Sequence, residues 1–148
     1  MKHSKFYQKQ NLPEELIFQE VGQDYFSFAY MMLKESINQI SEFAKKKNIP
    51  YLVVIVPARM QIDPEGWEVK EIQTTDIPQQ RIKEICADTH YAFCLDLLPV
   101  FRSQGHRMPL YYKNDLHWTP LGHQLAAQEV FKFLQEKHLI KIDRSTGN

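Results

Sequence analysis

The 148-residue chain has little of what several common protein classes require. Its two cysteines, Cys86 and Cys94, are too few for a disulfide framework, and each lies in an apolar segment where we expect a reduced, buried thiol. The longest aliphatic run, Leu52–Val56, is far shorter than the ~20 apolar residues of a membrane helix. The polar start, Met1–Gln10, shows no apolar stretch typical of a signal peptide. Neither a disulfide scaffold nor a membrane span is expected, and the compartment stays open.

An excess of one charge is also absent. Lys and Arg together number 18, as do Asp and Glu, so the formal net charge is zero. Nucleic-acid-binding domains usually carry a basic excess, so we expect no nucleic-acid partner. Hydrophobic residues make up 43% and aromatic residues 12% of the chain, which argues against disorder. Residues 1–148 are therefore expected to form a single domain that buries roughly two-thirds of its unfolded surface.

The clearest helix signal lies in the first third of the chain. Asp24 is a suitable N-cap and Asn48 a suitable end, and between them apolar residues recur every three or four positions. The lead segment Met1–Gln23 shows no clear pattern beyond a short helix that Pro13 opens and Gly22 ends. We expect the stripe of the long helix to face the core: Tyr25, Phe28, Ala29, Met32, Leu33, Ile37, Ile40 and Ala44.

Two short apolar runs predict strands, Ile49–Val56 and Ala92–Leu97. Both are continuous, which is typical of parallel strands covered on both faces. Further helices are expected at about Pro78–Thr89, starting at Asp76 or Ile77, and at Pro120–Glu136. The order helix, strand, helix, strand, helix predicts an α/β fold with a short parallel sheet. The remaining expectations are loops at Ala58–Thr75 and Ser103–Asn114, a cap at Thr119, and a last-helix stripe of Leu121, Leu125, Ala126, Val130, Phe131 and Leu134.

The densest group of residues capable of chemistry is Tyr111–His123. Asp115 and His117 are two positions apart, so in an extended stretch they point the same way while Leu116 points to the core. An aspartate beside a histidine can accept the Nδ1–H of the ring and leave Nε2 free to take a proton from a nucleophile. The spacing therefore favours a hydrogen-bonded pair facing a cleft. The alternative is an aspartate that caps a turn beside an ordinary histidine.

Neighbouring residues are candidates for substrate binding: Trp118, Tyr112 and Arg59. Tyr111, Tyr112 and Trp118 form either a sugar-stacking platform or the packing of the loop against the last helix. Arg59 follows the first strand, at the end where open α/β sheets bind ligands, and either binds an anion or is solvated, which we slightly favour.

A zinc site is a second interpretation of the same region. Imidazole and carboxylate groups are ligands that suit zinc, but their spacing here is irregular. The candidate ligands are His106, Asp115, His117 and His123. We favour the acid–base pair and expect no cofactor.

The block Asp115-Leu116-His117-Trp118-Thr119-Pro120-Leu121-Gly122-His123 resembles the C-terminal block of SGNH (GDSL-type) hydrolases. It is most similar to members related to alginate and other exopolysaccharide O-acetylation proteins. The resemblance covers about Tyr25–Leu134, and it implies a partial three-layer, flavodoxin-like fold and a Ser-His-Asp triad. In that triad His117 is the general base and acid, and Asp115 orients it. The implied function is that of an ester hydrolase or O-acyltransferase, with a small-molecule or carbohydrate ester, such as an O-acetyl ester, as substrate.

The triad's nucleophile has no counterpart in the sequence. The Gly-Asp-Ser block of the superfamily is missing, as are its glycine and asparagine oxyanion donors. Five serines lie in other settings: Ser27, Ser36 and Ser41 in or beside a helix, Ser103 without a suitable preceding strand, and Ser145 in a polar tail. We therefore expect this chain to be the C-terminal portion of an SGNH domain. It would associate as a homodimer or with the missing N-terminal half. The resemblance implies that full-length relatives are extracytoplasmic. The alternative is a non-catalytic interaction module or a degenerate fragment.

Overall fold

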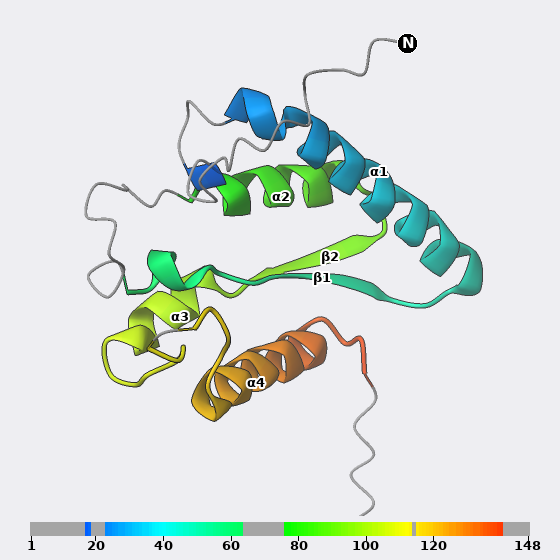
Figure 1. Ribbon diagram of the computed structural model, residues 1–148. Coiled ribbons are helices and arrows are strands. Elements are labelled where there is room, and N and C mark those ends of the chain that lie inside the picture. Colours follow the sequence, from blue (N-terminus) through cyan, green and yellow to red (C-terminus); the bar gives the residue numbers. More distant parts are fainter. Residues whose placement is uncertain (1–16, 19–22, 64–75, 114, 141–148) are drawn as a thin grey trace, which may run out of the picture.

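A computed structural model describes residues 17–18, 23–63, 76–113 and 115–140. Its elements in chain order are α1 (Gln23–Lys47), β1 (Tyr51–Ile55), the 3-10 turn η4 (Arg59–Gln61), α2 (Ile77–Asp88), β2 (Ala92–Asp96), α3 (Leu98–Gly105) and α4 (Pro120–Glu136). The two strands pair in parallel, as predicted, with Val53 opposite Cys94. Helices α1 and α2 lie on one side of the strands and α3 and α4 on the other, so the fold is a three-layer α/β arrangement (Figure 1).

The first strand is shorter than the apolar run that predicted it. Prolines flank it at positions 50 and 57, and a proline has no N–H to donate to a strand ladder. The residues beside those prolines, Ile49 and Val56, are exposed. Most of β1 and all of β2 are half-buried, so the expectation of full cover on both faces is wrong for these strands. Because the described sheet has only two strands, both β1 and β2 are edge strands.

The long helix α1 begins at Gln23, so Asp24 lies inside it and is not its cap. Its end is as predicted, because Asn48 adopts a left-handed φ of 53° directly after it. The described side chains of α1 that are buried are Ile37, Ser41 and Ala44, spaced four and three positions apart. The expected core stripe is wrong for Phe28, Ala29, Met32, Leu33 and Ile40, which are exposed.

The reason lies in the lengths of the elements. A helix of 25 residues spans about 37 Å. A strand of five residues spans only about 17 Å. The strands and α2 therefore cover only part of the apolar stripe of α1.

Helix α3 spans residues 98–102, for which the sequence predicted no element, and the first three residues of the predicted loop Ser103–Asn114. Pro99 lies in its first turn, and the Asp96 carboxylate accepts the Leu98 N–H at 3.0 Å. Eight residues are too few to display a helical period, which is why the pattern did not reveal this helix. Helix α3 contributes Leu98 and Phe101 to the hydrophobic core. The buried members of that core are Ile62, Leu97, Leu98, Phe101, Leu110, Tyr111 and Ala126.

Helix α4 has the predicted bounds and the predicted cap. The Thr119 hydroxyl oxygen accepts the Gly122 N–H at 3.3 Å and donates to the Pro109 carbonyl at 2.6 Å. A Cβ on Gly122 would lie 2.3 Å from the Leu110 carbonyl oxygen, so this close approach requires glycine. Part of the expected stripe is wrong, because Leu121 and Phe131 are exposed while Ala126 is buried.

Helix α2 and strand β2 carry the two cysteines. Neither cysteine forms a disulfide. Cys86 is buried as expected, whereas Cys94 is only half-buried. The side chain of Asp76 makes no cap hydrogen bond to α2, and its carboxylate instead pairs with Arg102 at 2.8 Å. This ion pair links the start of α2 to α3.

Parts of two expectations lie outside the described residues. They are most of the lead segment, including Pro13 and Gly22, and residues 64–75 of the loop after β1. Among the helices that the structure describes, none has the length and hydropathy of a membrane span.

Candidate functional site

The loop that carries Asp115 and His117 closes on itself before α4. Its two ends, Tyr111 and Trp118, pair in an isolated antiparallel bridge. Inside it, the Tyr112 N–H donates to the His117 carbonyl at 3.1 Å, and the Asp115 N–H donates to the Tyr112 carbonyl at 3.3 Å. The stretch is therefore bent, not extended, and the alternation of side chains expected for an extended chain does not apply.

Asp115 and His117 make the predicted contact. The Nδ1–H of His117 donates to Oδ1 of Asp115, and the backbone N–H of His117 donates to the same oxygen at 3.0 Å. These donors, the ring first, favour the charged carboxylate and lower the pKa of Asp115 below its ordinary value. With its proton held on Nδ1, a neutral ring has Nε2 free to accept another. The His117 side chain is 84% exposed, so that nitrogen is accessible.

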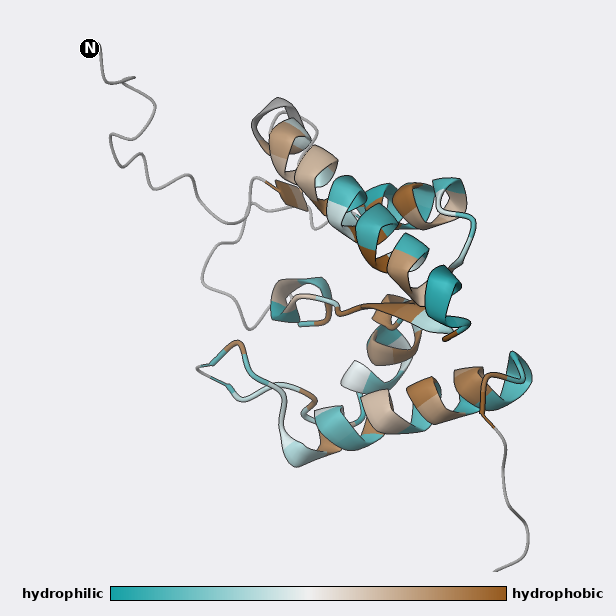
Figure 2. Ribbon diagram, turned by 90° about the vertical axis from the view of Figure 1, so that its right-hand side faces the viewer, coloured by the Kyte–Doolittle hydropathy of each residue, from teal (hydrophilic) through white to brown (hydrophobic). Residues whose placement is uncertain are grey.

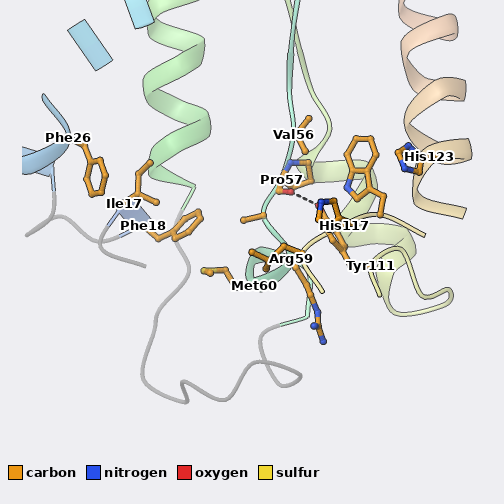
Figure 3. A pocket seen from close by; sticks show the side chains of 13 residues that line it. Ile17, Phe18, Phe26, Val56, Pro57, Arg59, Met60, Tyr111, His117 and His123 are labelled. Carbon is orange, nitrogen blue, oxygen red and sulfur yellow. Dashed lines mark hydrogen bonds between the residues drawn. The ribbon is translucent and has the colours of Figure 1, made fainter. Parts of the chain in front are cut away.

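A cavity of about 690 Å³ opens beside His117 (Figure 3). Leu116, expected to point into the core, is exposed and borders this cavity, because the bend turns it outward. Sequence reasoning missed the apolar wall, whose residues are distant in the chain and share no motif. The described lining consists of Ile17, Phe18, Phe26, Val56, Pro57, Ala58, Arg59, Met60, Tyr111, Leu116, His117, Trp118 and His123.

Arg59 is buried and holds two segments together, so the expectation that it is solvated is wrong. Its side chain is only 5% exposed, its guanidinium donates to the Lys113 carbonyl, and it lies 3.6 Å from the Asp63 carboxylate. Tyr111 makes a second link between the same two segments, because its hydroxyl donates a hydrogen bond to the Pro57 carbonyl. Burial raises the pKa of Tyr111 to about 12, so the hydroxyl keeps the proton that it donates. Both bonds hold the Asp115–His117 loop against the residues that follow β1.

A buried pair of glutamines holds the turn η4 in place. The side-chain amides of Gln61 and Gln79 donate to each other at 2.8 and 3.0 Å, and the Ala58 N–H donates to the same Gln61 oxygen at 2.9 Å. Each amide therefore finds a partner away from water, as buried polar groups require. The pair fixes the wall of the cavity on the β1 side to α2.

The aromatic cluster divides into packing and surface residues. Tyr111 and Trp118 both contact Phe101, with ring centroids 6.2 and 5.2 Å apart respectively, and Trp118 meets the edge of His123 at 5.3 Å. This supports the interpretation that the first two pack the loop against the core. Tyr112 is exposed and is not among the described residues that line the cavity. Tyr111 and Trp118 both pack against Phe101 and also line the cavity beside the pair.

The ligands proposed for zinc do not assemble among the described residues. No three His, Cys, Asp or Glu side chains there converge on a point that could hold a metal ion. His117 and His123 border the same cavity, whereas His106 borders a different one beside α3. The metal interpretation thus lacks its ligand set in this part of the chain.

None of the described serines lines the cavity beside His117, and Ser27 borders a different cavity. Ser36 donates to the Met32 carbonyl at 2.9 Å and Ser103 to the Val100 carbonyl at 2.8 Å, each within a helix. Ser41 is buried in α1. No serine, threonine or cysteine is among the described residues that line the cavity, and Ser145 lies outside them.

Comparison with known families supports the resemblance carried by the Asp115–His123 block. A family model described as the SGNH hydrolase-like domain of the acetyltransferase AlgX matches residues 30–146. Comparisons with curated proteins and with solved structures gave no match. The matched residues include both strands, the Asp115–His117 loop and all of α4. The chain therefore belongs to the family of SGNH hydrolase-like domains represented by the acetyltransferase AlgX.

Proposed function

We propose that this chain supplies the acid–base pair of an acyl-ester reaction, either ester hydrolysis or O-acyl transfer. His117 is the general base and acid, and Asp115 is the residue that orients it. The observation that carries the proposal is the Nδ1–H bond from His117 to Asp115 in a ring whose other edge is open. The family description names an acetyltransferase, and a carbohydrate O-acetyl ester is the simplest substrate of this class.

The proposed step is a proton transfer coupled to attack on the ester. A hydroxyl oxygen attacks the carbonyl carbon while its proton passes to Nε2 of His117. The Asp115 carboxylate stabilises the resulting imidazolium. When the ester C–O bond breaks, Nε2 returns the proton to the departing alkoxide. The ring ends neutral and ready for another cycle.

The attacking group of this reaction is not among the described residues that line the cavity. The Tyr111 hydroxyl, the one hydroxyl in that lining, already donates to a backbone carbonyl, and the pKa of this residue is raised to about 12. The nucleophile therefore comes from a residue outside this described lining, from another chain or from the acceptor itself. We expect the purified chain to be a half-site, and its own esterase rate to be low.

The ring tautomer tests the pairing directly. In wild type, ¹⁵N NMR of the neutral ring should show a protonated Nδ1 and a bare Nε2 for His117, because Asp115 accepts the Nδ1–H. In Asp115→Ala the Nε2–H form should become prominent. A His123→Gln variant serves as the control and should leave the His117 signals in the wild-type pattern. Unchanged tautomers in Asp115→Ala would overturn the role of Asp115.

Cleavage of p-nitrophenyl acetate tests the half-site. Wild type should cleave the ester no faster than an equal concentration of free imidazole, and His117→Ala should abolish whatever excess over buffer remains. A rate far above imidazole that survives His117→Ala would contradict the proposed base. A fast rate lost both in His117→Ala and in one Ser→Ala variant would keep the base and disprove the half-site.

A further inference from the structure

The cavity beside His117 is elongated and its two ends differ in chemistry (Figure 3). Phe18 and Phe26 lie at one end, and the His117 imidazole lies at the other. Met60 lies between these two ends, and Val56 lies at the His117 end. A molecule that fills this space meets a proton acceptor at one end and hydrocarbon along the rest of its length.

The wall offers few polar groups to a ligand. Tyr111 donates its hydroxyl to a backbone carbonyl, and Arg59 donates its guanidinium to another while pointing away from Val56 in Figure 3. Apart from the Trp118 indole, the polar side chains left on the described wall are those of His117 and His123. A sugar would need many hydrogen-bonding partners, since a buried hydroxyl without one is costly. The chemistry of the wall favours a hydrocarbon chain.

The volume points the same way. At about 690 Å³, the cavity falls within the range of ~300–1,000 Å³ that holds drug-sized ligands. The two carbons of an acetyl group would leave most of it unfilled. Each further methylene that leaves water for such a wall can tighten binding by up to about fourfold.

We infer that this cavity binds an acyl chain longer than acetyl, with the ester at His117 and the chain running past Val56 and Met60 toward Phe18 and Phe26. The inference rests on the proposed ester chemistry for the identity of the polar end. It keeps that acid–base chemistry and replaces the acetyl group of the simplest substrate with a longer acyl chain. The acceptor hydroxyl would then approach from the solvent side of the exposed His117 ring.

Unreactive amide isosteres measure this binding without any catalytic step. N-methylacetamide, N-methylbutanamide, N-methylhexanamide and N-methyloctanamide are titrated into the full chain, and the dissociation constants are taken from NMR shifts of the Trp118 indole and His117 ring. Affinity should rise about twofold to fourfold per methylene up to the eight-carbon chain. Equal affinity across the series would overturn the inference and leave the Asp115–His117 pairing, tested by its tautomer, untouched.

Two matched variants locate the binding. Val56 and Ile49 are β-branched residues just beyond opposite ends of β1, with exposures of 54% and 53%, and only Val56 borders the cavity. Val56→Asp should weaken octanamide binding at least tenfold and remove the dependence on chain length. Ile49→Asp should bind the series as wild type does, and thermal unfolding of both variants verifies that they fold.

Two other outcomes would also overturn the inference. A dependence on chain length that persists in Val56→Asp would place the binding elsewhere, for example on the exposed face of α1. A wild-type dimer in light scattering that binds no amide, and that becomes monomeric in Val56→Asp, would make a second copy of the chain the occupant. Graded affinities that only Val56→Asp loses, with a mass in light scattering that Val56→Asp leaves unchanged, would support the acyl chain.

Discussion

The long helix α1 and the segment from Leu97 to Trp118 reverse the usual relation between hydrophobic pattern and burial. Hydrophobic residues recur along α1 (Figure 2), yet Phe28 is 66% exposed. The segment that begins at Leu97 has a polar, loop-like second half, yet Leu97 and Phe101 are both 0% exposed. The segment with the weaker hydrophobic pattern contributes core residues, whereas much of the strongly patterned α1 lies at the surface.

The difference shows that periodicity predicts which element forms, whereas burial depends on what lies opposite that element. Helix α1 extends beyond the sheet and α2, so much of its stripe meets no partner among the described residues. Leu98 and Phe101 of α3 belong to the same buried cluster as Ala126 of α4, and Val54 and Leu95 of the strands pack against that cluster. Enclosure therefore gives a short helix more packing than a long helix gains from a single covered face.

The largest expected effect is the replacement of a phenylalanine in each region. Phe101→Ala should lower the free energy of unfolding by about 3–5 kcal/mol, because it empties the centre of the core. Phe28→Ala, at an exposed position of α1, should change it by no more than about 0.5 kcal/mol. Urea unfolding followed by circular dichroism measures both. Similar losses in the two variants would mean that α1 is covered in solution, and the comparison would fail.

A smaller loss is expected where α4 approaches the site loop. Gly122→Ala places a Cβ within 2.3 Å of the Leu110 carbonyl oxygen and 3.0 Å of the Trp118 side chain. The forced shift should cost about 1–3 kcal/mol of unfolding free energy. It should also move the NMR signals of His117. Gln124→Ala, an exposed substitution in the same helix, should alter neither. A neutral Gly122→Ala would show that this region is less tightly enclosed than the structure indicates.

The side of the sheet next to α2 can be tested through Cys94. Burial, together with the neighbouring Cys86 thiol, raises the pKa of Cys94 to about 12 from an ordinary value of 9.0. The folded thiol therefore keeps its proton at a pH where the unfolded thiol has lost it. Its contribution to stability is complete below pH 9 and falls as the pH rises toward 12, by at most about 1.4 kcal/mol per pH unit.

The measurement is the slope of unfolding free energy against pH between 9 and 10. The slope should be negative in wild type and clearly shallower in Cys94→Ala, whatever the absolute stability of that variant. Equal slopes would mean that water reaches the thiol. This side of the sheet would then be as open as the outer face of α1.

The smallest effect on folding concerns the surface of α1 and the open edges of the sheet. Each strand has one strand neighbour in the described sheet, and an unpaired edge is a template for another chain. We therefore expect light scattering to give a mass above the 17.6 kDa of one chain, as for an edge-to-edge homodimer. The double variant Phe28→Lys, Phe43→Lys should keep that mass and change the unfolding free energy by no more than about 0.5 kcal/mol.

Two results would change this account of association. A fall to one-chain mass in the double variant would move the interface to α1. A wild-type monomer that unfolds cooperatively and is unchanged by dilution would show that the chain completes its own fold.

Interactions between residues near in sequence were predictable. The cap of α4 needs only Thr119, Pro120 and Gly122, and the contact between Asp115 and His117 spans two positions. The family resemblance carried by that block is confirmed by the match over residues 30–146. The catalytic role of the pair stays a prediction, because geometry alone does not establish a reaction.

Contacts between distant segments were not predictable. Arg59 looked like a solvated cation until its bond to Lys113, 54 positions away, showed it to be buried. No motif joins Phe18 to Met60, yet both line the cavity beside His117.

Backbone propensity and capping act over a few residues, so the amino-acid order alone set the strands, α4 and the spacing of the Asp–His pair. Which faces are covered, and which side chains surround the imidazole, depends on contacts between segments that only the folded chain brings together.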